Sequence, residues 1–111
     1  MKTKIFRALA EPSRLQIVAL LRESPLTVGE IVDRLHIRQP QVSKHLRVLH
    51  EAGVVEFDAE ANRRIYKLRA EPFKELNSWL EQYRELWEER FENLDRYLHD
   101  LQKNGNKKDD N

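Results

Sequence analysis

Cysteine is absent from this chain of 111 residues. Without thiols the chain forms no disulfide, no thiolate metal site and no thiol redox switch, and we expect a cytoplasmic protein. Long hydrophobic runs are also missing, because no stretch approaches the roughly 18 consecutive apolar residues of a membrane span. The charged first residues, MKTKIFRALAEPSR, lack the apolar core of a signal peptide. We therefore expect no association with a membrane.

Catalytic motifs are missing as well. The sequence has no Gly-rich phosphate loop and no clustered pair of acids in a pocket-like context. Ser43 and His45 are only two positions apart, so on a helix their side chains diverge and cannot act as a nucleophile and its base. We expect a protein that is not an enzyme and that has no cofactor.

Charge is divided unevenly along the chain, although the net charge is only +1. Residues 1–70 hold 13 Lys and Arg against 8 Asp and Glu, whereas residues 71–111 hold 7 Lys and Arg against 11 Asp and Glu. A basic first part is suited to a polyanion, and an acidic second part is not. A chance imbalance on a mixed surface is the alternative.

Residues 38–53, RQPQVSKHLRVLHEAG, predict a helix with two different faces. Val42, Leu46 and Leu49 recur at helical spacing and form an apolar stripe, and Gly53 stands where a left-handed cap would end the helix. Amide, hydroxyl and basic groups lie beside or opposite the stripe, and such groups bind the phosphates and base edges of DNA. They belong to Gln41, Ser43, Lys44 and Arg47. The alternative is an ordinary solvated helix face.

A second helix precedes this one. Residues 27–30, TVGE, match a capping box at a helix start, and apolar residues between positions 28 and 35 supply a buried side. Residues 36–38 form a short break before the next helix. Two short amphipathic helices joined by a tight turn, the second with a polar and basic outer face, describe a helix-turn-helix.

The periodicity changes after the second helix. Residues 54–57 and 64–68 are short β-prone runs joined by a polar connection, and they predict a two-stranded hairpin. The side chains expected to face inward are those of Val55, Phe57, Ile65 and Leu68. Arg63 and Arg64 would reach a DNA backbone or minor groove from this wing. Pairing of these arginines with the acids of the turn, Asp58 and Glu60, is the alternative.

Residues 73–104 contain neither proline nor glycine and predict one uninterrupted helix. Apolar residues repeat along it at heptad-like spacing, with one stutter between Trp87 and Phe91. A helix of about 30 residues is roughly 45 Å long, which is longer than a core built from residues 1–70 can cover. The stripe therefore predicts a partner helix, most simply that of a second copy. The residues expected in this interface are Leu76, Trp79, Leu80, Tyr83, Trp87, Phe91, Leu94 and Leu98.

These features divide the chain into three parts. Residues 1–70 form a DNA-binding region, and residues 71–102 form a dimerisation helix of the same domain. Residues 103–111, KNGNKKDDN, form a polar tail that we expect to be disordered.

Four motifs together resemble one known family. Residues 6–14, FRALAEPSR, are similar to the F-x-A-L-[AS]-[DE]-P-[ST]-R opening of the ArsR-type winged helix-turn-helix repressors. Residues 39–55, QPQVSKHLRVLHEAGVV, resemble the recognition helix of that family and its exit, and residues 63–68, RRIYKL, resemble its second wing strand. The Trp- and Tyr-rich stretch from 76 to 98 resembles the last helix of a cysteine-free branch. The resemblance extends over residues 5–101, in the same order.

The resemblance implies a homodimeric repressor that is mainly helical with a small β-hairpin: a winged helix-turn-helix with a long C-terminal dimerisation helix. The first helix would join the last one in the dimer interface, which adds Ile5 and Phe6. The recognition helix, residues 39–52, would enter the major groove of a pseudo-palindromic operator in double-stranded DNA, and the wing, residues 58–64, would lie on backbone or minor groove. The residues expected to contact DNA are Arg38, Gln39, Gln41, Ser43, Lys44, Arg47, Arg63 and Arg64.

The chain departs from the family pattern at two places. Metal-sensing members carry a Cys-x-Cys pair where this chain has Thr27 and Gly29, so the thiolate sensor is absent. Members often have Ser at the position of Arg38, where it caps the recognition helix, and a lost cap costs about 0.5–2 kcal/mol. We therefore hypothesise that a DNA phosphate replaces the cap by binding Arg38 and the free N–H groups of the helix.

Three alternatives stay open. Asp95 and His99, at i and i+4 on the last helix, would be ligands in a metal-responsive repressor, although the paired ligands of such family members are missing and we expect no metal. A winged helix kept only as a protein-interaction scaffold is a different class of function. An effector, either a small molecule or a partner protein, is not identified by the sequence. The interface aromatics Trp79, Tyr83 and Trp87 suit either plain dimer core or the lining of an effector pocket.

Overall fold

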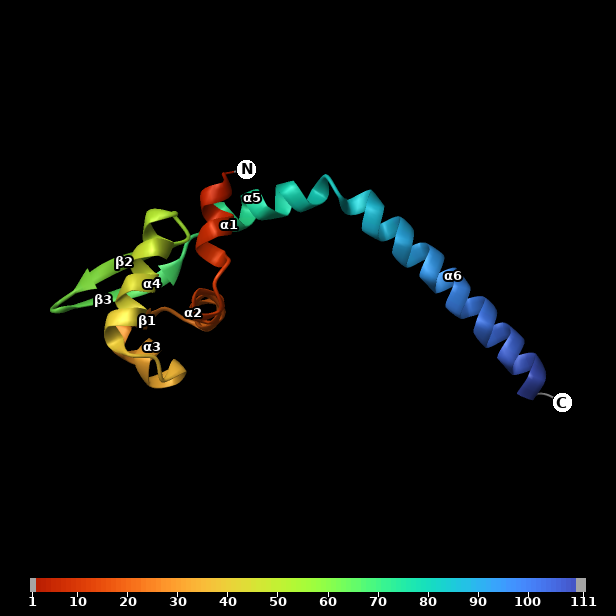
Figure 1. Cartoon of the computed structure of the whole chain (residues 1–111), viewed down its shortest axis with the longest axis horizontal. Coiled ribbons are helices and arrows are strands. Elements are labelled where there is room, and N and C mark those ends of the chain that lie inside the picture. The colour runs from red at the N-terminus through yellow and green to blue at the C-terminus, as the bar shows by residue number, and fades with distance from the viewer. Residues whose placement is uncertain (1, 110–111) are drawn as a thin grey trace. The chain divides into compact units, whose positions relative to one another are not determined.

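The computed structural model describes residues 2–109, without the side chains of residues 89–92 and 103–109. The chain forms two compact units, the first ending at Leu76 and the second beginning at Asn77. It is mainly helical with one small sheet, which confirms the expected fold class. The elements (Figure 1) are α1 (Thr3–Leu9), α2 (Pro12–Glu23), β1 (Leu26–Thr27), α3 (Val28–Leu35), α4 (Gln39–Glu51), β2 (Val55–Glu60), β3 (Arg63–Leu68), α5 (Ala70–Glu81) and α6 (Arg84–Asp109).

Side-chain caps mark the starts of α2 and α3. α2 follows Glu11, whose carboxylate accepts the Arg14 N–H at 2.9 Å, and has Pro12 in its first turn. At the start of α3 the Thr27 N–H donates to the Glu30 carboxylate at 3.0 Å and the Glu30 N–H donates to the Thr27 hydroxyl at 3.2 Å, which confirms the capping box. The hydrogen bonds from the backbone and hydroxyl of Thr27 hold the pKa of the Glu30 carboxyl below its usual value.

α4 ends in a left-handed turn at Gly53, as the sequence predicts. The Gly53 N–H donates to the His50 carbonyl at 3.0 Å, and the Val54 N–H donates to the Leu49 carbonyl at 2.9 Å. This pair of bonds forms a Schellman motif, which satisfies carbonyl groups at the helix end. Gly53 has φ of +78°, a conformation in which a Cβ atom is strained.

Replacing Gly53 by Ala should destabilise the protein, whereas replacing Gly29 by Ala should not. In Gly53→Ala the added Cβ adopts the left-handed conformation and lies 3.2 Å from Nη1 of Arg69, so we expect the free energy of unfolding to fall by about 1–2 kcal/mol. A Cβ added to Gly29 meets no atom within 4 Å, and Gly29→Ala should raise this free energy by up to about 1 kcal/mol. Urea unfolding at one protein concentration measures both; equal midpoints would contradict the role assigned to Gly53.

The sheet has three antiparallel strands in the order β1-β3-β2, whereas the sequence predicted a two-stranded hairpin. The missed strand, β1, has two residues: Leu26 lies opposite Tyr66 and Thr27 lies opposite Ile65. A strand this short carries no alternation that a sequence pattern can show. β2 and β3 are also longer than predicted, and only residues 61–62 connect them.

The register of β2 and β3 corrects the predicted inward face. Phe57 lies opposite Tyr66, whereas Ile65 lies opposite Asp58. Opposite residues share a face and successive residues alternate between faces, so Phe57 and Ile65 cannot both face inward. Tyr66 is buried in place of Ile65, which is half-buried beside β1.

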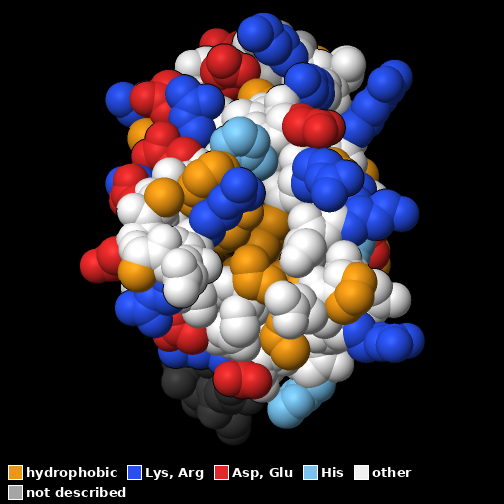
Figure 2. Space-filling view, turned by 90° about the vertical axis from the view of Figure 1, so that its left-hand side faces the viewer, with side chains coloured by type: hydrophobic (Ala, Val, Ile, Leu, Met, Phe, Trp, Pro, Cys, Tyr) orange, Lys and Arg blue, Asp and Glu red, His pale blue; other side chains and the backbone are white. Residues whose placement is uncertain are grey.

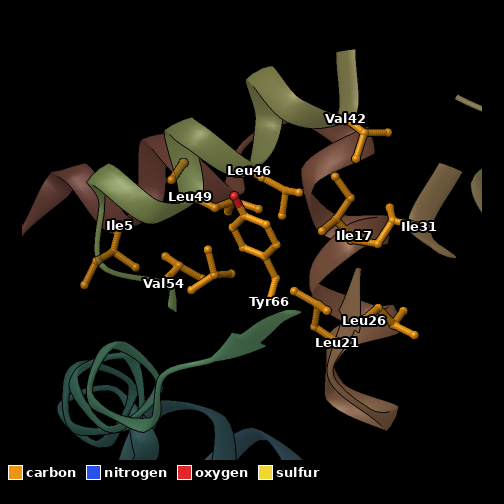
Figure 3. Close-up of a cluster of buried hydrophobic side chains, with 12 residues drawn as sticks. Ile5, Ile17, Leu21, Leu26, Ile31, Val42, Leu46, Leu49, Val54 and Tyr66 are labelled. Carbon is orange, nitrogen blue, oxygen red and sulfur yellow. The ribbon is translucent and has the colours of Figure 1, made fainter. Parts of the chain in front are cut away.

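The core of the first unit lies where α2, α3 and α4 meet β3. Ile17, Ile31 and Leu46, one from each helix, are at most 1% exposed. Figure 3 shows the ring of Tyr66 in the middle of this cluster. Leu15 of α2 is 52% exposed, because the core covers the side of the helix that carries Ile17.

The start of α5 packs with the first unit. Pro72 is buried, and Phe73 and Leu76 pack against the core. The sequence predicts that the dimerisation helix begins at residue 71, whereas residues 71–76 lie in the first unit.

The C-terminal helix is interrupted, whereas the sequence predicted one helix over residues 73–104. α5 ends at Glu81 and α6 begins at Arg84. Between them the Tyr83 N–H donates to the Leu80 carbonyl at 2.9 Å, the i→i−3 bond of a tight 3₁₀ turn. Gln82 and Tyr83 are not helix breakers, so helix propensity could not locate this turn.

α6 continues to Asp109 and so includes residues 103–109, which we expected to be disordered. Gly105 lowers helix stability by about 1 kcal/mol but does not end the helix. Residues 110–111 lie outside the described part of the chain. No helix within residues 2–109 combines the length and apolar character needed to cross a membrane.

Candidate nucleic-acid interface

The outward face of α4 carries the polar and basic residues that the sequence assigned to DNA. The opposite face is held in the core by Val42, Leu46 and Leu49, each at most 1% exposed. Because the apolar face fixes the helix, its outward groups project from a rigid backbone. The residues of this region expected to contact DNA are all exposed: Arg38, Gln39, Gln41, Ser43, Lys44 and Arg47.

The start of α4 has no side-chain cap, as predicted, and Arg38 is its N-cap residue. Pro40 has no N–H to donate, and the Gln41 N–H donates to the Arg38 carbonyl at 3.0 Å. Of the first three helix positions, only Gln39 has an N–H without a partner in the described part of the chain. A phosphate replacing the cap would therefore have one backbone N–H and the Arg38 guanidinium to bind, not the several free N–H groups of our hypothesis.

The wing presents two exposed arginines, Arg63 and Arg64. Among the described residues neither arginine forms an ion pair, so the alternative pairing with Asp58 and Glu60 is not found. Asp58 instead pairs with Lys67, with 3.1 Å between Oδ2 and Nζ. The charges of the two wing arginines are thus available to a ligand.

A hollow of about 540 Å³ is bordered by α4, the wing and the start of α3. Figure 2 shows the side of the molecule that carries the wing, with hydrophobic side chains exposed at its centre and Lys and Arg side chains around them. The predicted DNA-contact residues that line the hollow are Gln39, Ser43, Arg47, Arg63 and Arg64. The predicted DNA-contact residues outside its lining are Gln41 and Lys44, on α4, and Arg38, which precedes that helix.

The hollow is also lined by polar residues that the sequence analysis did not assign to DNA contact: Thr27, His50 and Asn62. His50 follows Ser43 by two helical turns and Arg47 by one, so helical spacing on the exposed face could have identified it. Thr27 reaches the hollow through the pairing of β1 with β3, which no local pattern showed.

Among the described side chains, no three His, Asp or Glu lie close enough together to hold a metal ion. Asp95 and His99 are exposed on α6. His45 is half-buried, with Nδ1 at 3.4 Å from Nη1 of Arg14 and 3.8 Å from Oε2 of Glu11. This is the environment of a hydrogen-bonding residue between helices rather than of a metal ligand.

A second candidate surface is apolar and lies on the second unit. Its side chains are 44% to 49% exposed, and contiguous apolar side chains with this exposure mark interaction surfaces. They belong to Leu80, Tyr83, Trp87, Leu94 and Leu98, and similar exposure extends the stripe to Leu86, Tyr97 and Leu101. The side chain of Phe91 lies outside the described part.

Other residues expected in the dimer interface are placed differently. Ile5 is 4% exposed and lies in the core of its own chain, so its side chain supports the fold instead of facing a partner. Leu76 also packs against that core. Phe6 is 37% exposed, and Trp79 is half-buried with its ring centroid 5.1 Å from that of Tyr83.

Comparison with known proteins identifies the family. Residues 11–56, from the start of α2 into β2, match the family model described as "Bacterial regulatory protein, arsR family". A solved ArsR family transcriptional regulator is similar with a TM-score of 0.70 and 31% identity, over 78% of this chain and 94% of that chain. The chain belongs to the ArsR family.

This ArsR-family protein is also similar to curated regulators. The HTH-type transcriptional repressor SmtB of Mycobacterium tuberculosis is 48% identical over 65 residues, which are 59% of this chain and 48% of SmtB. An uncharacterised HTH-type transcriptional regulator of Methanocaldococcus jannaschii is 36% identical over 74 residues, which are 66% of this chain and 83% of that protein. The chain thus spans about half the length of SmtB. Its relatives are transcriptional regulators rather than enzymes, which confirms the expected class.

Proposed function

We propose that this ArsR-family protein is a homodimeric, sequence-specific DNA-binding repressor that occupies a promoter and blocks polymerase. The observation that carries the proposal is the lining of the hollow between α4 and the wing. Three arginines and several amide and hydroxyl groups line it, and no Asp or Glu does, although the chain has 19 acidic residues. A concave surface without carboxylates, bordered by cations, suits a polyanion.

The shape of α4 fits the major groove. An α-helix has the width that this groove admits, and the exposed face of α4 carries side chains that pair with base edges. The side chain of Arg47 can form two hydrogen bonds to guanine, and those of Gln39 and Gln41 can do so to adenine. The Ser43 hydroxyl can hydrogen-bond to either base. Lys44 and Arg38, together with the arginines of the wing, would bind phosphates and so orient the protein.

The exposed apolar stripe of α6 supports a dimer. A second copy offers an identical stripe, and a two-fold interface buries both at once. Pairing would hold two α4 helices roughly 34 Å apart, one turn of DNA, which suits a pseudo-palindromic operator. The acidic character of the second part of the chain would keep this helix away from the DNA backbone.

Binding to a fragment of its own upstream DNA tests the proposal. We expect saturable binding whose logarithm of affinity falls linearly with the logarithm of salt concentration, with a slope of about −0.9 for each phosphate contacted. Fluorescence anisotropy measures the slope, and a scrambled fragment of the same length and composition, expected to bind more weakly, is the control. Absence of saturable binding at low salt would contradict the proposal and favour a protein-interaction scaffold.

A further inference from the structure

The two arginines of the wing lie in different surroundings, although they are neighbours in the sequence. The register places Arg64 opposite Ala59 and Arg63 opposite Glu60. Successive residues of a strand point to opposite faces of the sheet. Arg64 therefore shares the face of Phe57, whereas Arg63 shares a face with an acidic residue.

The guanidinium of Arg64 lies over the ring of Phe57. Its Cζ is 4.3 Å from the ring centroid, well within the roughly 6 Å over which a cation is attracted to an aromatic face. Ala59, the cross-strand partner of Arg64, has only a methyl group. It leaves the arginine room to lean diagonally across the sheet to Phe57.

The ring of Phe57 is itself held from two sides. Its centroid is 5.3 Å from that of His50, on α4, and 5.4 Å from that of Tyr66, on β3. Both distances are within the range of favourable aromatic pairs, and Phe57 packs against the core. The ring therefore links Arg64, on the wing, to the recognition helix.

Arg64 also differs from the next two cations along the chain, Lys67 and Arg69. Lys67 pairs with Asp58, and Arg69 pairs with Glu56. Within the described residues Arg64 has no carboxylate partner, and an aromatic face orders its side chain instead. A cation that is ordered before binding and keeps its charge loses less conformational entropy when it meets a phosphate.

We propose that Phe57 is a positioning residue for DNA binding, which holds Arg64 at the hollow beside α4. Arg64, rather than Arg63, is then the principal anchor of the wing on the DNA backbone. This inference rests on the proposed function, because it assigns roles within the same surface. All three residues line the hollow, and only Phe57 and Arg64 are joined by a contact between ring and cation.

A double-mutant cycle in the operator-binding assay tests the inference. Phe57→Leu removes the ring and keeps apolar bulk, and Arg64→Ala removes the cation. We expect Phe57→Leu to weaken binding about three- to fivefold in the wild-type background. In the Arg64→Ala background the same change should weaken binding less than about 1.5-fold, because there is no guanidinium left to position.

Two further variants separate positioning from packing. Phe57→Tyr retains the ring and should bind as the wild type does. Arg63→Ala removes a neighbouring charge that does not contact the ring, so Phe57→Leu should weaken binding as much in that background as in the wild type. Thermal unfolding followed by circular dichroism shows which variants are folded at the assay temperature.

An observation without DNA provides a second readout. In the free protein, the ring current of Phe57 should shift the side-chain proton resonances of Arg64, and this shift should disappear in Phe57→Leu and persist in Phe57→Tyr. The inference would be overturned if the Arg64 resonances were unchanged in Phe57→Leu. It would also be overturned if Phe57→Leu weakened binding as much in the Arg64→Ala background as in the wild type. If the wild type itself binds no DNA, the proposed function fails; if it binds and the two losses are additive, only the role of Phe57 fails.

Discussion

Replacing both Leu94 and Leu98 by Glu should convert the protein to monomers and lower its affinity for an operator about a thousandfold. Each leucine is close to half exposed in the single chain, and burying such a side chain contributes about 1.5–3 kcal/mol. A two-fold interface contains each substitution twice, and every new carboxylate would be desolvated there. A monomer contacts one half-site only and loses the gain of roughly 10²–10⁴ that comes from linking two binding modules.

Arg96→Glu is the matched control for this double variant. It changes the net charge by the same two units, and Arg96 is exposed on α6 about 200° around the helix from Leu94. The control should remain a dimer and bind DNA. Sedimentation velocity gives the oligomeric state, and anisotropy gives the affinity. A double variant that stays dimeric and binds DNA normally would show that a different surface joins the subunits.

Replacing Arg47 by Ala should reduce both affinity and specificity. Arg47 is exposed on α4 and lines the hollow. A bidentate contact between arginine and guanine contributes about 1–3 kcal/mol of discrimination at each half-site. This free energy corresponds to a ratio of about 5- to 150-fold between the affinities for the right and the wrong base. A symmetric operator contains the contact twice. The affinity for operator DNA should therefore fall more than the affinity for scrambled DNA.

Arg22→Ala is the control for the loss of one positive charge. Arg22 is exposed near the end of α2 and does not line the hollow. This variant should bind operator DNA nearly as well as the wild type. Competition of labelled operator against scrambled DNA measures the specificity ratio of each protein. If Arg47→Ala weakens binding to both DNA molecules equally, Arg47 contacts a phosphate and no base.

Local sequence signals were sufficient to predict α4. The stripe of Val42, Leu46 and Leu49 and the left-handed stop at Gly53 each depend on residues less than two turns apart. The same is true of the capping box at the start of α3. Such signals do not depend on tertiary structure, because helix geometry alone determines which side chains share a face.

Strand faces and the turn in the last helix were beyond local reasoning. Whether Ile65 or Tyr66 faces the core depends on the register of β3 against β2 and on its pairing with β1, which lies far away in the sequence. A shift of one residue exchanges the two faces. The turn at Tyr83 interrupts a stretch in which every residue is an acceptable helix former, so the pattern indicated a continuous helix.

The sequence by itself determined the family, the order of the helices, the exposed polar face of α4 and the presence of two basic residues on a wing. Only the tertiary structure decided that four residues of α4 and the wing arginines line one hollow free of carboxylates. It also decided that Arg64 lies on the ring of Phe57, whereas Arg63 does not. The physical reason is that periodicity specifies which side of an element faces the core. The contacts between elements depend on register and packing, which form only when the chain folds.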